Sequence, residues 1–123
     1  MKSEKTSFIA GRLKSLTYAF KGFYTLVTTE HSIISQLIIG GVMCILGFYF
    51  KISTIEWLFQ ILAIGLVLTA ESLNTAIEAI CDYIQPNFDK KIGVIKDIAA
   101  GAVTFAAITA TIIGAIIYLP KIF

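Results

Sequence analysis

The stretch Ile55-Glu-Trp-Leu-Phe-Gln-Ile-Leu-Ala-Ile-Gly-Leu-Val-Leu-Thr-Ala70, followed directly by Glu71-Ser-Leu-Asn-Thr-Ala-Ile-Glu-Ala-Ile-Cys-Asp82, decides the fold of this 123-residue chain. Its first 16 residues are mostly apolar. As a helix rising about 1.5 Å per residue they cover roughly 24 Å of a hydrocarbon layer about 30 Å thick. Three carboxylates and a carboxamide then follow, where an unpaired charge is costly to bury. The sequence therefore predicts a membrane-spanning helix with a functional polar end.

The polar residues at that end share one face of the helix. At 100° per residue, Glu71, Asn74, Glu78 and Asp82 fall within about 80° of one another. Glu71 is expected just inside the membrane boundary, and Glu78 and Asp82 beyond it. We call these four residues the polar stripe. It is predicted to lie where lipid headgroups meet hydrocarbon and to face a partner helix, a cation or a water-filled cleft.

The composition is that of a small integral membrane protein. Hydrophobic residues make up 57% of the chain, charged residues 15%, and the mean hydropathy is +0.84. Residues 33–50, 55–84 and 98–119 form three apolar segments, each long enough to span a membrane. We expect an all-α membrane protein with one domain, residues 1–123. The net charge of +2 is too small and too dispersed to indicate nucleic-acid binding.

The basic residues predict the orientation of the spans. They lie mainly before the first span (Lys2, Lys5, Arg12, Lys14 and Lys21) and between the second and third spans (Lys90, Lys91 and Lys96). By the positive-inside rule, the N-terminus and the loop between the second and third spans are cytoplasmic. The polar stripe is then expected on the cytoplasmic side.

Residues 11–28 have the pattern of an amphipathic helix. Apolar residues recur at spacings of three and four (Leu13, Leu16, Phe20, Phe23 and Val27), with basic residues mostly on the other face. This pattern predicts a helix on the membrane surface, and the alternative is a packing helix of a soluble domain. Glu30 follows the helix and is expected at the cytoplasmic boundary of the first span.

The third span is predicted to follow a short loop. Pro86 with Asn87 is expected to end the second span and to begin a loop over residues 85–93. The third span then begins at Lys96-Asp97. It carries small residues at four-residue spacing (Ala102, Ala106, Ala110 and Gly114), a face that lets another helix approach closely. Since three spans cannot shield the whole polar stripe from lipid, we expect a homo-oligomer.

Six polar residues meet at one membrane face in this topology: Glu30, Glu71, Glu78, Asp82, Lys96 and Asp97. Five carboxylates and one lysine are not balanced in charge, and Mg²⁺ suits such oxygen ligands. A lysine beside the cation can hold a phosphate oxygen. Since the sequence contains no P-loop and no protein-kinase motif, the residues indicate a different kind of metal–phosphate site.

Other interpretations of single residues and of the whole chain remain open. Asp97 could be a helix N-terminal residue favoured by the dipole, Asp82 a solvated boundary residue, and Asn74 a bridge between helices. The chain as a whole could be a small oligomeric ion or drug transporter that uses an intramembrane glutamate. A non-catalytic membrane assembly factor is a third reading.

The spacing Glu71-x-x-Asn74-Ser/Thr-Ala-Ile-Glu78-x-x-x-Asp82, followed by Lys96-Asp97-x-x-x-Gly/Ala-Ala-Val, resembles the signature of the bacterial diacylglycerol kinase and undecaprenol kinase family. The resemblance extends to residues 12–22 and to Glu30, so it covers nearly the whole chain. It implies a homotrimer of three-span subunits in the bacterial cytoplasmic membrane. Composite active sites would transfer the γ-phosphate of ATP to diacylglycerol, giving phosphatidic acid, or to undecaprenol, giving undecaprenyl phosphate.

The resemblance also implies roles for residues of the polar stripe. Glu71 would be the general base on the lipid hydroxyl. Asn74 would orient that base or a phosphate. Glu30 and Glu78 would be the Mg²⁺ ligands and would lie beside the nucleotide. These roles agree with phosphoryl transfer, which needs charge neutralisation and an aligned nucleophile.

The remaining roles concern the nucleotide. Lys96 would bind the phosphates of ATP, and Asp82 and Asp97 would support the nucleotide site. The chain departs from the family at Ile34 and Gln36, where members often carry polar or charged residues, and in the loop 88–91, which lacks a histidine common there. The residues that contact the adenine base are therefore not predicted. The generic apolar residues of the spans do not select between the two lipids.

Overall fold

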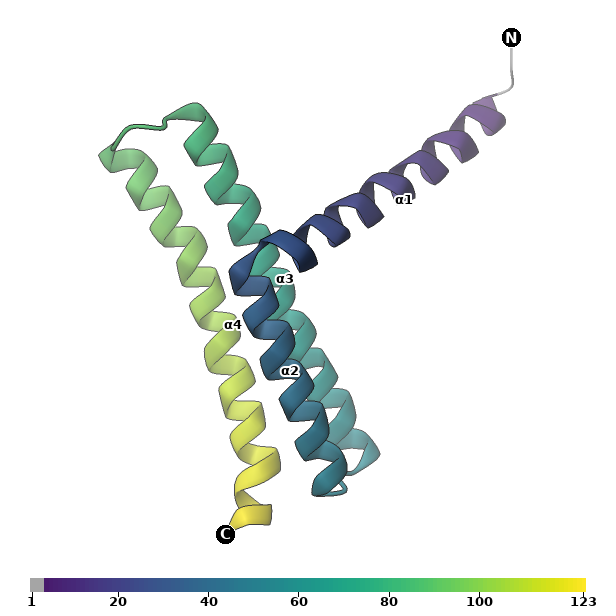
Figure 1. The fold of residues 1–123 in the computed structure, drawn as a ribbon, viewed down its shortest axis with the longest axis vertical. Helices are drawn as coiled ribbons and strands as arrows, with labels where there is room; N and C mark the ends of the chain where they lie inside the picture. The colour runs from purple at the N-terminus through teal and green to yellow at the C-terminus, as the bar shows by residue number, and fades with distance from the viewer. Residues whose placement is uncertain (1–3) are drawn as a thin grey trace. The chain divides into compact units, whose positions relative to one another are not determined.

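The computed structural model describes residues 4–123, and this range is all-helical, as predicted. It contains four helices in chain order (Figure 1): α1 (Glu4–Thr29), α2 (His31–Tyr49), α3 (Thr54–Ile84) and α4 (Lys90–Ile122). By length and composition α2, α3 and α4 can each cross a membrane. The chain divides into two compact units, one up to Ile34 and one from Ser35 to Phe123. The assignment of residues 1–123 to a single domain stays a prediction.

Helix α1 is longer than the sequence predicts. It begins at Glu4, seven residues before the expected start at residue 11. Gly11 does not end the helix because a glycine in a helix costs only about 1 kcal/mol relative to alanine. The side chains of residues 7–25 are exposed in this unit. The placement of α1 on a membrane surface stays a prediction.

Helices α2 and α3 closely match the predicted spans. The connection between them is four residues long, from Phe50 to Ser53, as expected. Ser53 begins α3 with a capping box: its Oγ accepts from the Glu56 backbone N–H at 3.2 Å, and its own N–H donates to Glu56 Oε1 at 2.9 Å. Helix α3 ends at Ile84, before Pro86, as predicted.

Helix α4 begins earlier than predicted, because the expected loop over residues 85–93 ends at Asp89, and the helix extends beyond both ends of the expected span, residues 98–119. The helix begins at Lys90 because Asp89 caps it, accepting from the backbone N–H groups of Lys91 at 2.9 Å and Ile92 at 3.1 Å. Asp97 is consequently the eighth residue of the helix. The helix dipole acts within the first turn, which excludes the N-terminal interpretation of Asp97.

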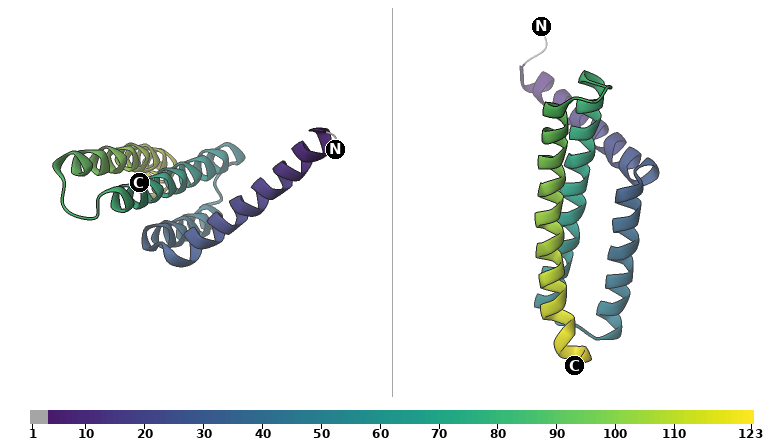
Figure 2. Two further views of the ribbon diagram at one scale, coloured as in Figure 1. Left: turned by 90° about the horizontal axis from the view of Figure 1, so that it is seen from above. Right: turned by 90° about the vertical axis from the view of Figure 1, so that its left-hand side faces the viewer.

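In the second unit α3 and α4 are antiparallel and lie side by side, whereas α2 stands apart from them over most of its length (Figure 2). The hairpin has a Glu56 end and an Asp82 end, named here after the α3 residue at each. At the Glu56 end a cluster of apolar side chains joins all three helices: Ile52, Ile117 and Tyr118, with Met43, Leu46, Phe50, Trp57 and Ile113. Gly47 lets α2 approach closely there, since an added Cβ would lie 2.8 Å from the Trp57 ring.

The outer surface of the second unit is apolar. Large hydrophobic side chains are exposed along all three helices, for example Ile45 at 70%, Leu62 at 67% and Phe105 at 78%. Continuous apolar surface of this extent is not found on monomeric soluble proteins. The three apolar helices are therefore those of a membrane protein.

Candidate functional site

The polar stripe is formed on one face of α3, near the Asp82 end. The Asn74 Nδ2 atom donates a hydrogen bond to Glu78 Oε1 at 3.0 Å, one helical turn away. This contact confirms that Asn74 and Glu78 share a face, as their spacing predicts. The other carboxylate oxygen of Glu78 has no hydrogen-bond partner among the described residues.

Lys96 of helix α4 forms an ion pair with Asp82 of the polar stripe. Its Nζ atom lies 2.5 Å from Asp82 Oδ1, and the two side chains are 37% and 63% exposed. Asp82 is thus an ion-pair partner of Lys96 that also stays largely exposed to solvent. A lysine ammonium has three N–H donors, and within the described residues only one of them has an acceptor, Asp82 Oδ1. Two donors of Lys96 are left for a bound group.

Glu71 occupies the deepest position of the stripe. It is half-buried. Its backbone carbonyl accepts from Thr75 Oγ1 at 3.0 Å, but its carboxylate has no hydrogen bond or ion pair with other residues of the described range. A half-buried carboxylate with both oxygens available can accept a proton from a substrate.

Asn74 carries an unused acceptor. Its Oδ1 atom is buried and has no hydrogen-bond partner in the part of the chain that the structure describes. A buried polar atom left in this state costs roughly 1–3 kcal/mol, so native structures rarely retain one without a reason. The geometry therefore suits a donor from outside this subunit, either a substrate or a neighbouring chain.

The site residues also fit a magnesium ion shared with phosphates. No group of three or more acidic, histidine or cysteine side chains gathers in residues 4–123. Mg²⁺ does not need such a cage, because it usually takes one or two carboxylates and completes its shell with water and phosphate oxygens. Glu78, with one free oxygen, can supply one of these ligands.

Two predicted site residues, Glu30 and Asp97, form no part of the contacts described above. Glu30 lies between α1 and α2, is half-buried, and belongs to the first compact unit, whereas the stripe belongs to the second. Asp97 is exposed on α4 beside Lys96 and has no polar contact with the other described residues. The predicted roles of both residues, including Glu30 as a metal ligand, stay predictions.

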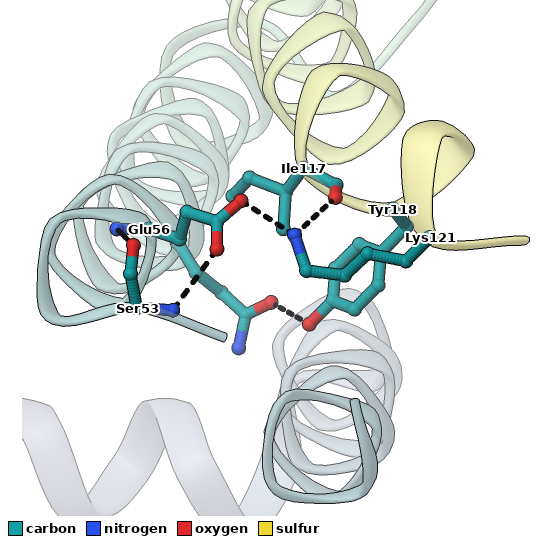
Figure 3. Close-up of polar contacts among 6 residues, drawn as sticks. Ser53, Glu56, Ile117, Tyr118 and Lys121 are labelled. Carbon is teal, nitrogen blue, oxygen red and sulfur yellow. Dashed lines mark hydrogen bonds and ion pairs between the residues drawn. The ribbon is translucent and has the colours of Figure 1, made fainter. Parts of the chain in front are cut away.

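A second polar group, at the Glu56 end, was not predicted. Lys121 Nζ lies 2.6 Å from Glu56 Oε2 and donates to the Ile117 carbonyl at 2.9 Å (Figure 3). Beside them the Tyr118 hydroxyl donates to Gln60 Oε1. The spacing Ser53-x-x-Glu56 of a capping box was a readable signal for part of this group.

Gln60 ties the three helices together at this end. It is only 4% exposed. Its Nε2 donates to the Met43 carbonyl of α2 at 3.1 Å, while its Oε1 accepts from Tyr118 of α4. Both ends of its carboxamide are therefore used within the chain, and the group has a structural role.

Comparisons with known proteins identify a family whose model covers all of these candidate site residues. A family model described as prokaryotic diacylglycerol kinase matches residues 17–118, a range that contains every candidate site residue. The chain is 37% identical over 109 residues to the undecaprenol kinase of Bacillus subtilis (strain 168), covering 89% of each chain. It is 30% identical over 111 residues to the diacylglycerol kinase of Synechocystis sp. (strain ATCC 27184 / PCC 6803 / Kazusa), covering 89% of this chain and 63% of that protein.

Proposed function

Because this chain belongs to the prokaryotic diacylglycerol kinase family and is a membrane lipid kinase, we propose that it transfers the γ-phosphate of ATP to the hydroxyl group of a lipid alcohol at the membrane boundary. The relatives are named for undecaprenol and for diacylglycerol, and each of these lipids offers one such hydroxyl. The transporter alternative has no support from the family. The observation that carries the proposal is the free carboxylate of Glu71 on one face with Asn74, Glu78 and the Asp82–Lys96 pair.

Glu71 acts as the general base. Its carboxylate takes the proton of the lipid hydroxyl while the lipid oxygen attacks the γ-phosphorus, and the bond between that phosphorus and the bridging oxygen of ADP breaks. The products are a lipid phosphate and ADP, and the proton on Glu71 later returns to water. A positioned base of this kind contributes roughly 10²–10⁴-fold to a rate.

Asn74 and Glu78 orient the reacting groups. Their mutual hydrogen bond fixes the carboxamide, so that the buried Oδ1 of Asn74 can accept from the lipid hydroxyl or from a group of a neighbouring subunit. Glu78 would hold Mg²⁺ through its free oxygen, with Glu30 as the second carboxylate. When bound, Mg²⁺ neutralises charge on the phosphates.

Lys96 holds the phosphates of ATP. Two of its N–H donors are available for phosphate oxygens, and Asp82 fixes the ammonium group from the other side. Asp97, next along α4, supports the nucleotide site. In phosphoryl transfer such charge stabilisation contributes more than covalent chemistry by the protein.

We further propose a homotrimer with composite active sites and with the Asp82 end at the cytoplasmic membrane face of a bacterium. The apolar surface supports burial in lipid, and the unpartnered Oδ1 of Asn74 supports a contact from outside the subunit. The basic residues near the start of α4, Lys90, Lys91 and Lys96, support the cytoplasmic placement, where ATP is found.

A direct assay tests this function. The purified full chain in mixed micelles, given ATP, Mg²⁺ and equal amounts of diacylglycerol and undecaprenol, is expected to form a phosphorylated lipid, and the dominant product identifies the preferred alcohol. Chelation of the metal should abolish the reaction. Absence of any lipid phosphate from the wild-type protein, with folding verified by circular dichroism, would contradict the proposal.

A further inference from the structure

Helix α1 carries only positive charge between residues 5 and 29. This stretch holds the basic residues Lys5, Arg12, Lys14 and Lys21, and its sequence contains no aspartate or glutamate. The surfaces of soluble proteins usually mix both signs of charge. The side chains of Arg12, Lys14 and Lys21 are exposed and have no hydrogen-bond or ion-pair partner among the described residues. Helix α1 therefore offers unbalanced positive charge to a partner outside the chain.

The apolar residues of α1 gather on one face. At 100° per residue, a set of them falls within about 100° of the helix circumference. This set is Ile9, Leu13, Leu16, Phe20, Phe23, Tyr24 and Val27. Large members of the face are exposed, for example Phe20 at 71% and Phe23 at 63%. An exposed apolar face of this size needs an apolar surface to cover it.

The basic residues flank this apolar face. Lys14 and Lys21 lie about 60–80° beyond one edge of it, and Arg12 lies about 20° beyond the other edge. The side opposite the apolar face carries small polar residues instead, such as Ser15 and Thr25. When the apolar face enters a membrane, flanking lysine and arginine side chains reach the level of the lipid headgroups.

Lys21 stands in a shallow groove on the surface of α1. Thr17, Phe20, Tyr24 and Thr25 line the groove with it. The hydroxyls of Thr17 and Thr25 donate to backbone carbonyls of the helix at 3.2 and 3.0 Å, so neither hydrogen is available to a ligand. The donors that remain among these side chains are the Lys21 ammonium and the Tyr24 hydroxyl, which suit an anionic oxygen. The aromatic rings beside them suit the apolar part of a lipid.

We propose that α1 binds the phosphate groups of anionic phospholipids through Arg12, Lys14 and Lys21 while its apolar face enters the hydrocarbon. Placement on a membrane surface needs only hydrocarbon, whereas the flanking cations also select the class of lipid. Zwitterionic lipids supply the same hydrocarbon but no net charge to balance the three cations. A membrane with anionic lipid therefore holds α1 more firmly than a neutral membrane does.

Two other anionic partners fit the helix less well. The polar stripe of a neighbouring subunit is acidic, but it would pair with the cations and leave the apolar face of α1 uncovered. The phosphates of ATP carry charge but cover none of that face either. Anionic lipid satisfies both parts of the helix at once, because its phosphate and its hydrocarbon lie on the two sides of one interface.

Binding of α1 to the membrane also fixes the backbone of Glu30. The Glu30 N–H donates to the Leu26 carbonyl in the last turn of α1 at 3.3 Å, and the Glu30 carbonyl accepts from the Ile34 N–H at 3.0 Å. Glu30 is thereby held to the end of α1 and to the first turn of α2. Since Glu30 is a proposed Mg²⁺ ligand, a further consequence rests on the proposed function: lipid phosphorylation should be faster in anionic membranes.

Amide hydrogen exchange tests the binding of headgroups without turnover. The full-length protein is placed in nanodiscs of phosphatidylcholine alone or with about one third phosphatidylglycerol, and exchange of residues 7–29 is followed by mass spectrometry. Each basic residue near an anionic surface contributes about fivefold to binding, so exchange should be roughly 100-fold slower in the anionic discs. Added salt should weaken this difference. Equal exchange in the two kinds of disc would overturn the inference.

Lys14→Gln combined with Lys21→Gln removes two of the flanking charges and keeps the apolar face. In anionic discs residues 7–29 of this variant should exchange roughly 30-fold faster than in the wild type, and in neutral discs at the same rate. Lys90→Gln combined with Lys91→Gln is the matched control, because it removes the same charge from exposed residues at the start of α4. An equal effect of the control, or slower exchange on adding ATP to neutral discs, would overturn the inference.

The kinase assay separates the consequence at Glu30 from the binding itself. Wild-type kcat should rise severalfold from neutral to anionic discs, and the double variant of Lys14 and Lys21 should lose this rise. If exchange responds to anionic lipid but kcat does not, the consequence at Glu30 is wrong. If the wild type phosphorylates no lipid at all, the proposed function fails, whereas the exchange measurement still decides the binding of headgroups.

Discussion

The two ends of the α3–α4 hairpin contain the same kinds of residue in different states. Each end has a carboxylate–lysine pair that joins α3 to α4: Glu56–Lys121 at 2.6 Å and Asp82–Lys96 at 2.5 Å. Each end also has a carboxamide on α3, Gln60 at the first and Asn74 at the second. Composition alone therefore does not separate a structural end from a functional one.

The two ends differ in how many hydrogen-bond donors and acceptors have no partner among the described residues. At the Glu56 end, Glu56 has a partner for each carboxylate oxygen, Lys121 has two acceptors, and Gln60 is satisfied at both ends of its carboxamide. At the Asp82 end the Asn74 Oδ1 atom has no partner in the described residues, and the Glu71 carboxylate has no hydrogen bond or ion pair with them either. Unused hydrogen-bonding capacity, rather than the presence of an ion pair, distinguishes a candidate site.

The largest expected effect is a difference in kcat between variants of Glu71 and of Glu56, the glutamates compared at the two ends. Glu71→Gln should lower kcat by roughly 10²–10⁴-fold because it removes the proposed base. The melting temperature should stay unchanged, since the Glu71 carboxylate stabilises no other described group. Lipid phosphorylation and thermal unfolding in the same detergent measure both quantities. Glu56→Gln is the matched control, with the reverse pattern expected. Near-normal kcat in Glu71→Gln would exclude the general-base role.

The two lysines give the next largest contrast. Lys96→Met should raise the KM for ATP roughly 10- to 100-fold, because charged hydrogen bonds to phosphate are lost. Lys121→Met should lower the melting temperature and leave the KM for ATP as it is. Steady-state kinetics over a range of ATP concentrations, with thermal unfolding of both variants, provide the test. Equal effects of the two variants on KM would remove Lys96 from phosphate binding.

The carboxamides of Gln60 and Asn74 are expected to differ in how much each contributes to the free energy of unfolding. Gln60→Leu should lower the free energy of unfolding by about 0.5–1.5 kcal/mol, because the Tyr118 hydroxyl and the Met43 carbonyl each lose Gln60 and keep their mutual hydrogen bond of 3.1 Å. Asn74→Leu should not lower it comparably, since its buried Oδ1 is unpartnered in the subunit. Denaturation in mixed micelles compares the two. A larger loss for Asn74→Leu would contradict the contrast.

The smallest expected effect concerns the turn at the Glu56 end. Lys51 adopts a left-handed conformation with φ of 51°, which strains a residue with a Cβ. Lys51→Gly should therefore raise stability by about 0.5–1 kcal/mol and leave lipid phosphorylation unchanged. Thermal unfolding and the kinase assay check the two parts. A loss of activity would show that this end is not purely structural.

Local signals predicted much of the fold and the family. The apolar run of α3 and Pro86 after it predicted that helix to within one residue, since both signals lie in adjacent sequence. The helical period predicted that Asn74 and Glu78 share a face, and their hydrogen bond confirms it. The spaced motif from Glu71 to Asp97 indicated the family to which the chain belongs. The start of α4 was predicted wrongly because the cap at Asp89 was not recognised.

The sequence by itself determined three apolar helices, a polar stripe on one face of α3, and membership of a lipid kinase family, because hydrophobic length, helical period and motif spacing are properties of adjacent residues. Only the tertiary structure decided which polar groups are hydrogen-bonded within the described residues and which are not. Gln60 and Tyr118 are 58 residues apart in the chain, and Glu56 and Lys121 are 65 residues apart. Hydrogen-bond saturation and a cavity of about 450 Å³ between α2, α3 and α4 depend on how separate helices pack, and neither is encoded in any single stretch.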